Sequence, residues 1–295
     1  MTFPIPFFYS DAGTLQSVPA DGEFSVGVLE TMRARHGAIP LLPGHLARLA
    51  RSASPDPGVL QRIEAAALLI AKRTADWAEG ARIRLRYGVL YGETVWDFSV
   101  VPLEGNSPWQ HGVSLSLCET RVTPQASLSP FPLEAAGQSM EARQGLAHKF
   151  ASGCKLLQRD VYTRAERELD EKAAGPRPGL FHEGLLLDDQ GRVIEGLRSN
   201  LLVWRDGRWS TPSLRNCGVR GVMLGWLAAR VEISEDDLLI SDLEQAEELA
   251  VCNAVRGVVP VVQMTLGSLT EERLRTLYPG SATTAMRTLV ASDLH

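Results

Sequence analysis

The first third of the chain alternates between two kinds of hydrophobic pattern. Runs in which apolar and polar residues alternate predict strands, and apolar residues spaced three and four apart predict helices. The strands are expected at residues 28–34, 82–87 and 94–103, and the helices from Pro43 and over residues 58–77. Residues 39–42 are expected to pair with the first strand as a hairpin. Together these elements predict an α+β fold.

The second half of the chain begins with one long predicted helix and continues as short strands. The helix is expected from about Leu146 to about Lys172, where a stretch rich in glycine and proline stops it. A helix is also expected after Gly218, and residues 249–252 are predicted to form a buried strand. Between the long helix and Gly218, turns separate four short strands, at residues 184–188, 192–195, 200–204 and 209–211. These strands predict an antiparallel meander.

A proline-rich stretch separates these two halves. Pro124, Pro130 and Pro132 lie among serine and glycine residues that interrupt regular structure. A length of 295 residues suits two domains of ordinary size. We therefore predict a small N-terminal domain over residues 1–118, a linker over residues 119–139 and a larger C-terminal domain over residues 140–295.

Composition and charge narrow the class of protein. With 44% hydrophobic and 22% charged residues the composition is globular, and a formal net charge of −5 provides no basic field for nucleic acid. The apolar runs are shorter than the ~20 residues of a membrane span, and the N-terminus lacks the basic start of a signal peptide. The four cysteines are scattered without metal-ligand spacing, which favours a cytoplasmic protein with reduced thiols and no metal.

Two loops are candidate anion sites. Residues 218–223 place a glycine turn before a helix, whose free N–H groups favour phosphate. Residues 252–257 place an asparagine and an arginine directly after the predicted buried strand. Neither loop matches a Walker motif or a dinucleotide-binding fingerprint. Taken singly, these loops and the side chains of Arg48, Lys149 and Glu195 are more typical of ordinary structural roles.

These features occur in one order, and that order resembles the fold type IV pyridoxal-phosphate enzymes. This family includes branched-chain aminotransferases, D-amino-acid aminotransferases and 4-amino-4-deoxychorismate lyases. The resemblance implies a small N-terminal α/β domain, a larger C-terminal pseudo-barrel domain, and pyridoxal 5′-phosphate as the cofactor. It rests on Gly27–Ala53 with its HLARL motif, His148-Lys149, Gly184–Pro212 with its E-x-x-x-x-N spacing, GVRGVM at Gly218–Met223, and LAVCNAVRGVVPV at Leu249–Val261.

The resemblance also implies roles for single residues. Lys149 matches the lysine that holds the cofactor as a Schiff base and moves protons, and Lys155 takes this role if the helix has a shifted register. Glu195 matches the carboxylate that keeps the cofactor ring nitrogen protonated, and Arg48 matches the cation that binds the phosphate. The other matched cofactor-binding positions are Asn200, Val222, Met223, Asn253 and Ala254.

The Cys-Asn-Ala-Val-Arg-Gly run at residues 252–257 is most similar to the aminodeoxychorismate lyases. This similarity implies conversion of 4-amino-4-deoxychorismate to 4-aminobenzoate and pyruvate. Arg256 is the first candidate to bind the substrate carboxylates, followed by Arg84 or Arg86. The alternatives are a class IV aminotransferase acting on branched-chain or D-amino acids, and a non-catalytic cofactor-binding or scaffold protein. The expected partners are a small anionic amino substrate and a second copy of the chain in a homodimer, with no nucleic acid and no membrane.

Overall fold

The chain divides into two units, and the boundary between them differs from the predicted one. The computed structural model describes residues 7–123, 153–171, 178–266 and 273–294. The first unit comprises Met1–Gly105 with Gln125–Gln158, and the second comprises Asn106–Pro124 with Arg159–His295. We expected the first domain to end at residue 118. It ends near residue 105, because strand β6 (Val113–Val122) belongs to the sheet of the second unit and takes in the start of the predicted linker.

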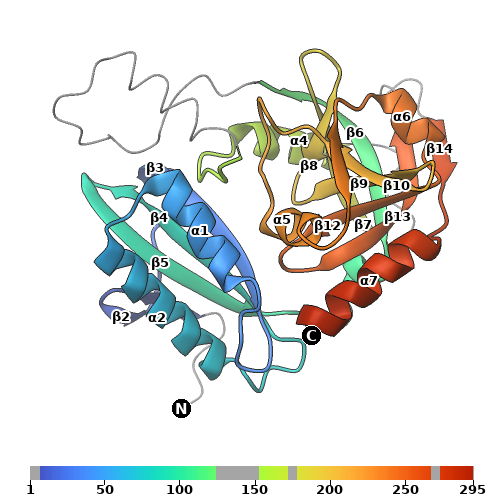
Figure 1. Cartoon of the computed structure of the whole chain (residues 1–295). Helices are drawn as coiled ribbons and strands as arrows, with labels where there is room; N and C mark the ends of the chain where they lie inside the picture. Colours follow the sequence, from blue (N-terminus) through green and yellow to red (C-terminus); the bar gives the residue numbers. More distant parts are fainter. Residues whose placement is uncertain (1–6, 124–152, 172–177, 267–272, 295) are drawn as a thin grey trace. The chain divides into compact units, whose positions relative to one another are not determined.

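The first unit is built on a five-stranded antiparallel sheet (Figure 1). The strands lie in the order β2-β1-β5-β4-β3. All three strands predicted in this part of the sequence are present, and β3 and β4 pair along their full lengths. The bounds are β1 (Phe7–Ser10), β2 (Gly13–Leu15), β3 (Phe24–Ala34), β4 (Ala81–Leu90) and β5 (Glu93–Pro102).

Two helices, α1 (Leu42–Ala53) and α2 (Pro57–Arg73), pack their apolar faces against this sheet. Each carries a proline in its first turn, where the fixed φ of proline suits a helix. The hairpin expected over residues 39–42 is wrong, since only one bridge, Arg35 to Ala38, forms there. The chain turns directly into α1 because β4 supplies the longer alternating partner for β3.

The segment before helix α4 is extended rather than helical. Leu29 N donates to Lys155 O at 2.7 Å and Leu157 N donates to Gly27 O at 2.9 Å, so this segment lies along β3. Successive side chains of an extended segment point to opposite faces, and Leu156 and Leu157 accordingly pack into two different apolar clusters. The predicted long helix is therefore shorter in its described part, where α4 spans Asp160–Glu171.

The second unit contains a nine-stranded mixed sheet. Eight strands follow the order β11-β10-β9-β12-β13-β6-β7-β8, and β14 pairs with β13. Strand β6 runs parallel to both of its neighbours. The bounds are β7 (Phe181–Asp188), β8 (Val193–Gly196), β9 (Asn200–Arg205), β10 (Arg208–Pro212), β11 (Ile233–Asp236), β12 (Glu248–Asn253), β13 (Gly257–Leu266) and β14 (Arg273–Thr276).

The predicted meander is replaced by two separate hairpins. Strand β7 pairs with β8, and β9 pairs with β10, but β8 and β9 are not neighbours in the sheet. The other edge of β9 pairs with β12 instead. The apolar β12, which the sequence predicts as a buried strand, therefore has a partner on each edge. The connection between β8 and β9 contains polar residues such as Arg198 and Ser199.

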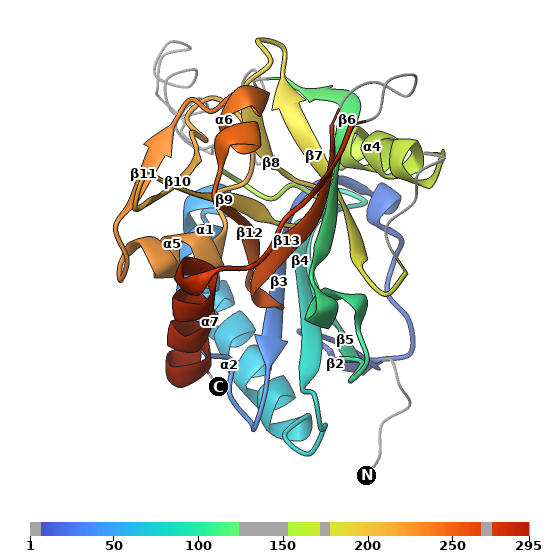
Figure 2. The same cartoon turned by 90° about the vertical axis from the view of Figure 1, so that its right-hand side faces the viewer.

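Short helices surround the sheet of the second unit. Figure 2 shows α7 alongside β12 and β13, which it also contacts. None of the helices in the described part of the chain is long and apolar enough to span a membrane. In addition to α4, the helices are α5 (Val222–Ala228), α6 (Ile240–Gln245) and α7 (Ser281–Leu294), with 3-10 turns at Asp21–Glu23 in the first unit and Pro108–His111 in the second.

Candidate functional site

A buried ion-pair cluster joins β3 to α1 in the first unit. Glu30 on β3 is 2% exposed, and His45 and Arg48 reach it from one face of α1, where residues three apart are neighbours. His45 Nδ1 lies 2.6 Å from Glu30 Oε2. Arg48 donates from Nε to Oε1 at 2.7 Å and from Nη2 to Oε2 at 2.5 Å. This two-point pairing explains why Arg48 is buried, unlike an ordinary surface arginine.

Neighbouring charges set the protonation states in this cluster. Burial by itself would raise the pKa of Glu30, but Arg48 and His45 outweigh it and hold that pKa at about 2. Burial lowers the pKa of His45, and the nearby Arg48 and Lys155 cations add to this effect against the pull of Glu30. The ring of His45 is therefore neutral at pH 7. Its Nε2 atom is buried and has no hydrogen-bond partner among the described residues, so a ligand can pair with it.

Lys155 lies next to this cluster. Its partly buried Nζ is 3.2 Å from the Oγ1 of Thr31, which follows Glu30 on β3. The extended pairing with β3 carries Lys155 to this position. Lys149, our first prediction for the Schiff-base lysine, lies outside the described residues. Of the two candidate lysines, Lys155 is the one whose surroundings the structure describes.

A second buried polar cluster surrounds Glu195 on β8. Glu195 is 3% exposed, and each of its carboxylate oxygens accepts a hydrogen bond. The Tyr162 hydroxyl donates to Oε1 at 2.6 Å, and Val219 N donates to Oε2 at 3.0 Å. The tyrosine comes from α4 and the backbone amide from the loop before α5. Three elements of the second unit therefore meet at one carboxylate.

Asn200, at the start of β9, braces the same loop. Its Nδ2 donates to Val219 O at 2.9 Å, and its Oδ1 accepts from Gly221 N at 3.1 Å. A Cβ atom at Gly221 would lie 2.0 Å from this Oδ1, so the loop requires glycine there. Asn200 therefore holds the loop that leads into Val222 and Met223, the first two residues of α5.

The turn between β12 and β13 contains the remaining predicted cofactor positions. Asn253 Oδ1 accepts from Val255 N at 3.0 Å and from Arg256 N at 2.8 Å. These bonds close a turn through Ala254, which ends at Gly257 with φ of 72°. Asn253, Ala254 and Arg256 are all partly exposed, and they lie together in this turn.

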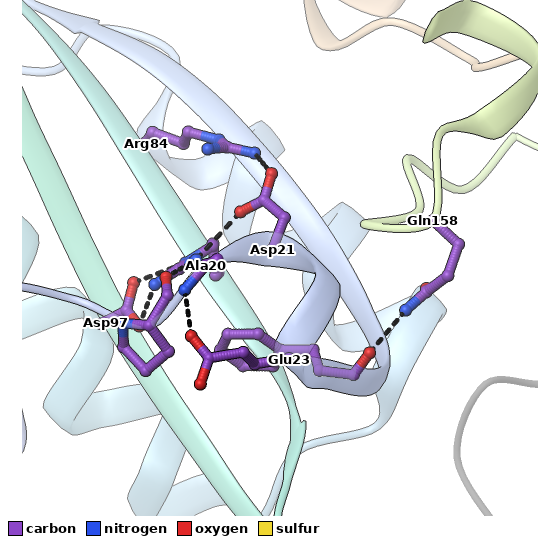
Figure 3. A network of polar contacts seen from close by, with 9 residues as sticks. Ala20, Asp21, Glu23, Arg84, Asp97 and Gln158 are labelled. Carbon is purple, nitrogen blue, oxygen red and sulfur yellow. Dashed lines mark hydrogen bonds and ion pairs between the residues drawn. The ribbon is translucent and has the colours of Figure 1, made fainter.

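Arg84 and Arg86, the other predicted substrate-binding residues, take part in an ion-pair network of the first unit. Figure 3 labels Arg84, Asp21 and Asp97 of this network. Arg84 forms an ion pair with Asp21. The buried Arg86 donates to both oxygens of Asp97 at 2.9 and 2.8 Å, and also to Asp21. Arg86 Nη1 further donates to Pro19 O at 2.7 Å. The guanidinium of Arg86 therefore donates to acceptors on β5 and in the turn before β3.

Sequence reasoning missed several polar residues of these clusters, including Glu30 and His45 of the ion-pair cluster. Thr31 contacts Lys155, and Tyr162 contacts Glu195, as described above. Glu183 on β7 is fully buried, accepting from Arg198 N and from Ser199 Oγ, both at 3.2 Å, in the loop after Glu195. Burial raises the pKa of Glu183 to about 7. Glu183 lies directly before the predicted strand at residues 184–188, so the sequence carried no clear signal for it. No group of acidic, histidine or cysteine side chains in the described ranges could hold a metal.

Comparisons with known proteins agree with the order of these elements. The family model for amino-transferase class IV matches residues 27–264. An aminodeoxychorismate lyase of Vibrio harveyi is 30% identical over 159 residues, which cover 52% of this chain and 48% of that protein. The match therefore spans about half the length of that relative.

Solved structures are similar over nearly the whole chain. The 4-amino-4-deoxychorismate lyase from Pseudomonas aeruginosa has a TM-score of 0.70 at 25% identity, covering 97% of this chain and 99% of that one. A hypothetical aminotransferase from Mycobacterium tuberculosis in its PLP-bound form has a TM-score of 0.74 at 20% identity, with 98% of each chain covered. The second likeness concerns the fold alone.

Proposed function

This chain belongs to the class IV aminotransferase family, whose members are pyridoxal-phosphate-dependent enzymes, and we propose that within it the protein is a 4-amino-4-deoxychorismate lyase. It would convert this substrate to 4-aminobenzoate and pyruvate. The observation that carries the proposal is the similarity to two lyases, the Vibrio harveyi protein over half its length and the Pseudomonas aeruginosa structure over 97% of this chain. The Cys-Asn-Ala-Val-Arg-Gly turn at residues 252–257 supports it.

We assign the Schiff-base role to Lys155 in preference to Lys149. A lysine that forms a Schiff base must reach its neutral amine form, which burial and neighbouring cations favour. The Lys155 amine is partly buried, lies 3.2 Å from the Thr31 hydroxyl and is close enough to His45 to influence its pKa. The buried His45 Nε2 beside it is a polar atom that a ligand can satisfy. These surroundings fit the aldehyde cofactor.

Glu195 suits the role of partner for the protonated ring nitrogen. Its Oε1 accepts a hydrogen bond from the Tyr162 hydroxyl and its Oε2 accepts one from Val219 N, and donors of this kind favour the ionised carboxylate. When bound, the cofactor supplies an electron sink for the bond-breaking step. The negative charge of Glu195 would keep that sink protonated.

By resemblance to the family, we assign the cofactor phosphate to Arg48 and to backbone amides of two loops. Arg48 provides a fixed cation, since Glu30 fixes two of its donor groups. The N–H groups of Val222 and Met223 at the start of α5, and the turn of Asn253 and Ala254, supply further donors. In this scheme Asn200 acts through the loop that it braces and makes no direct contact with the cofactor.

The substrate carries carboxylates, and we assign Arg256 to bind them. It lies in the partly exposed turn after β12, whereas Arg86 is buried and uses its donors within the first unit. The Lys155 amine would remove the proton from the ring carbon that bears the amino group. The carbon–oxygen bond to the enolpyruvyl group then breaks, the ring becomes aromatic, and the leaving group takes up a proton to become pyruvate.

The reaction is tested by supplying the substrate to the cofactor-loaded protein without any keto acid. A lyase releases pyruvate and 4-aminobenzoate in equal amounts over many turnovers. An aminotransferase would stop after one turnover with one equivalent of pyridoxamine phosphate, and a non-catalytic binding protein would release nothing. Either of these results contradicts the proposal. Lys155→Ala should abolish turnover, while the matched control Lys149→Ala should retain it.

We also propose that the protein is a homodimer, as its family resemblance implies, and that it is cytoplasmic, as its scattered cysteines indicate. Light scattering coupled to size-exclusion chromatography gives the mass directly. A mass near twice 32.2 kDa supports the dimer, and a mass of 32.2 kDa for the active protein contradicts it.

A further inference from the structure

Tyr162 makes a contact with Glu195 that no motif of the sequence indicates. Its hydroxyl donates to Glu195 Oε1 at 2.6 Å, a short distance typical of a bond to an ionised acceptor. The backbone of Glu195 is fixed separately, because β8 pairs with β7 opposite Leu186. The tyrosine therefore acts on the orientation and charge of the carboxylate and leaves the position of the strand unchanged.

The tyrosine itself is held firmly. The guanidinium of Arg159 lies 4.0 Å from the centre of its ring, and Arg159 Nη2 donates to Leu197 O at 2.9 Å. The residue directly before α4 is thus attached to the loop that follows Glu195. Burial and the adjacent carboxylate raise the pKa of Tyr162 well above its usual value, so the hydroxyl keeps its proton.

A neutral donor has a specific advantage at this position. The Tyr162 hydroxyl and the Val219 amide both stabilise the ionised carboxylate without adding a charge of their own.

We propose that Tyr162 is a positioning residue that holds Glu195 ionised and oriented toward the cofactor ring nitrogen. This inference rests on the proposed role of Glu195. Because this role involves only the ring nitrogen, removing the tyrosine hydroxyl should weaken binding of a ligand that has this nitrogen more than binding of one that lacks it.

The test compares two ligands of the cofactor-free protein. Pyridoxamine 5′-phosphate carries the ring nitrogen but no aldehyde, and its 1-deaza analogue has a C–H group in place of the nitrogen. The ratio of their dissociation constants, measured by fluorescence titration, reports the contact with the nitrogen independently of turnover and of the lysine. The wild-type protein should prefer the natural ligand, and Glu195→Gln should lose most of that preference.

Tyr162→Phe should reduce the preference about 10-fold, which corresponds to the loss of one hydrogen bond to a charged group. The phenylalanine ring keeps the surface on which Arg159 packs, so the variant should fold, and its thermal unfolding confirms this. Thr163→Val, on the exposed side of the same helical turn, is the matched control and should keep the wild-type ratio.

Two results would overturn the inference, and they differ in what else they affect. A Tyr162→Phe protein that keeps the wild-type ratio, while Glu195→Gln loses it, refutes the role of Tyr162 and leaves that of Glu195 standing. A wild-type protein that binds both ligands equally refutes the ring-nitrogen role of Glu195, and with it the inference.

Discussion

Replacing Glu30 with glutamine should destabilise the protein strongly, because it leaves the Arg48 charge buried without its counter-ion. Arg48 is 6% exposed and Glu30 is 2% exposed, so water cannot replace the lost partner. Removing one member of a buried ion pair costs about 3–5 kcal/mol. The pKa gives a similar figure: the fall from 4.5 to about 2 in the folded protein corresponds to about 3 kcal/mol.

The same ion pair predicts how stability depends on acid. The pKa of Glu30 is lower in the folded protein than in the unfolded chain, so the folded state favours the ionised form. This contribution is complete above pH 4.5 and is lost as the pH falls from 4.5 toward 2. Glu30→Gln cannot ionise, and this part of the acid dependence should disappear from its unfolding free energy.

Urea denaturation of the full chain measures these free energies. The double variant Glu30→Gln/Arg48→Met should be more stable than Glu30→Gln alone, since an apolar side chain at position 48 needs no charged partner. Arg48→Met alone supplies the fourth corner of the cycle. A loss below about 1 kcal/mol in Glu30→Gln, the size found for exposed ion pairs, would refute the buried-pair interpretation.

Three further predictions concern the second unit. Asn200→Ala should cost about 1–3 kcal/mol and weaken phosphate-dependent cofactor affinity, because it removes two hydrogen bonds to partly buried loop backbone. Unchanged values in urea denaturation and cofactor titration would contradict the bracing role. Glu183 has a folded-state pKa of about 7, above its ordinary 4.5, so its protonated form stabilises the protein below pH 4.5 and this contribution is lost as the pH rises to 7. Glu183→Gln should flatten that slope in a pH series of unfolding free energies, and an unaltered slope would contradict the raised pKa of Glu183. Burial raises the pKa of Cys252 to about 12 and that of Cys217 to about 11, so both thiols should resist a disulfide reagent at pH 8 until the chain is unfolded. Rapid labelling of either thiol in the native protein would contradict this.

Local pattern predicted most of the strands because their hydrophobic alternation agrees with the final sheet. Strands β4, β7 and β12 lie where the alternation or the apolar run places them. The pairing of β9 with β12 could not be predicted in the same way, because a short turn is compatible with a meander as well as with two hairpins. Long-range partners, not local propensity, decide between them.

The segment around Lys155 shows a second limit of local reasoning. The sequence predicted one long helix that runs through this segment and continues over α4. The edge of β3 supplies backbone partners that a helix would not use, and the segment is extended up to the start of α4. The extended conformation places the Lys155 amine beside Thr31 on β3.

The sequence predicted candidate site residues where they belong to a motif, but not where a tertiary contact alone singles them out. Arg48 and Glu195 were predicted from their motifs, and the structure shows that both are buried polar residues held by hydrogen bonds. Thr31 and Tyr162 were missed because each is an ordinary residue of its element. Their importance follows only from the partner that the fold brings to them.

The identity of the lysine that carries the cofactor is the most direct test. We predict that sodium borohydride reduction of the pyridoxal-phosphate-loaded protein, followed by peptide mapping, places the phosphopyridoxyl group on Lys155. A group on Lys149, or no stable adduct on either lysine, would contradict this assignment.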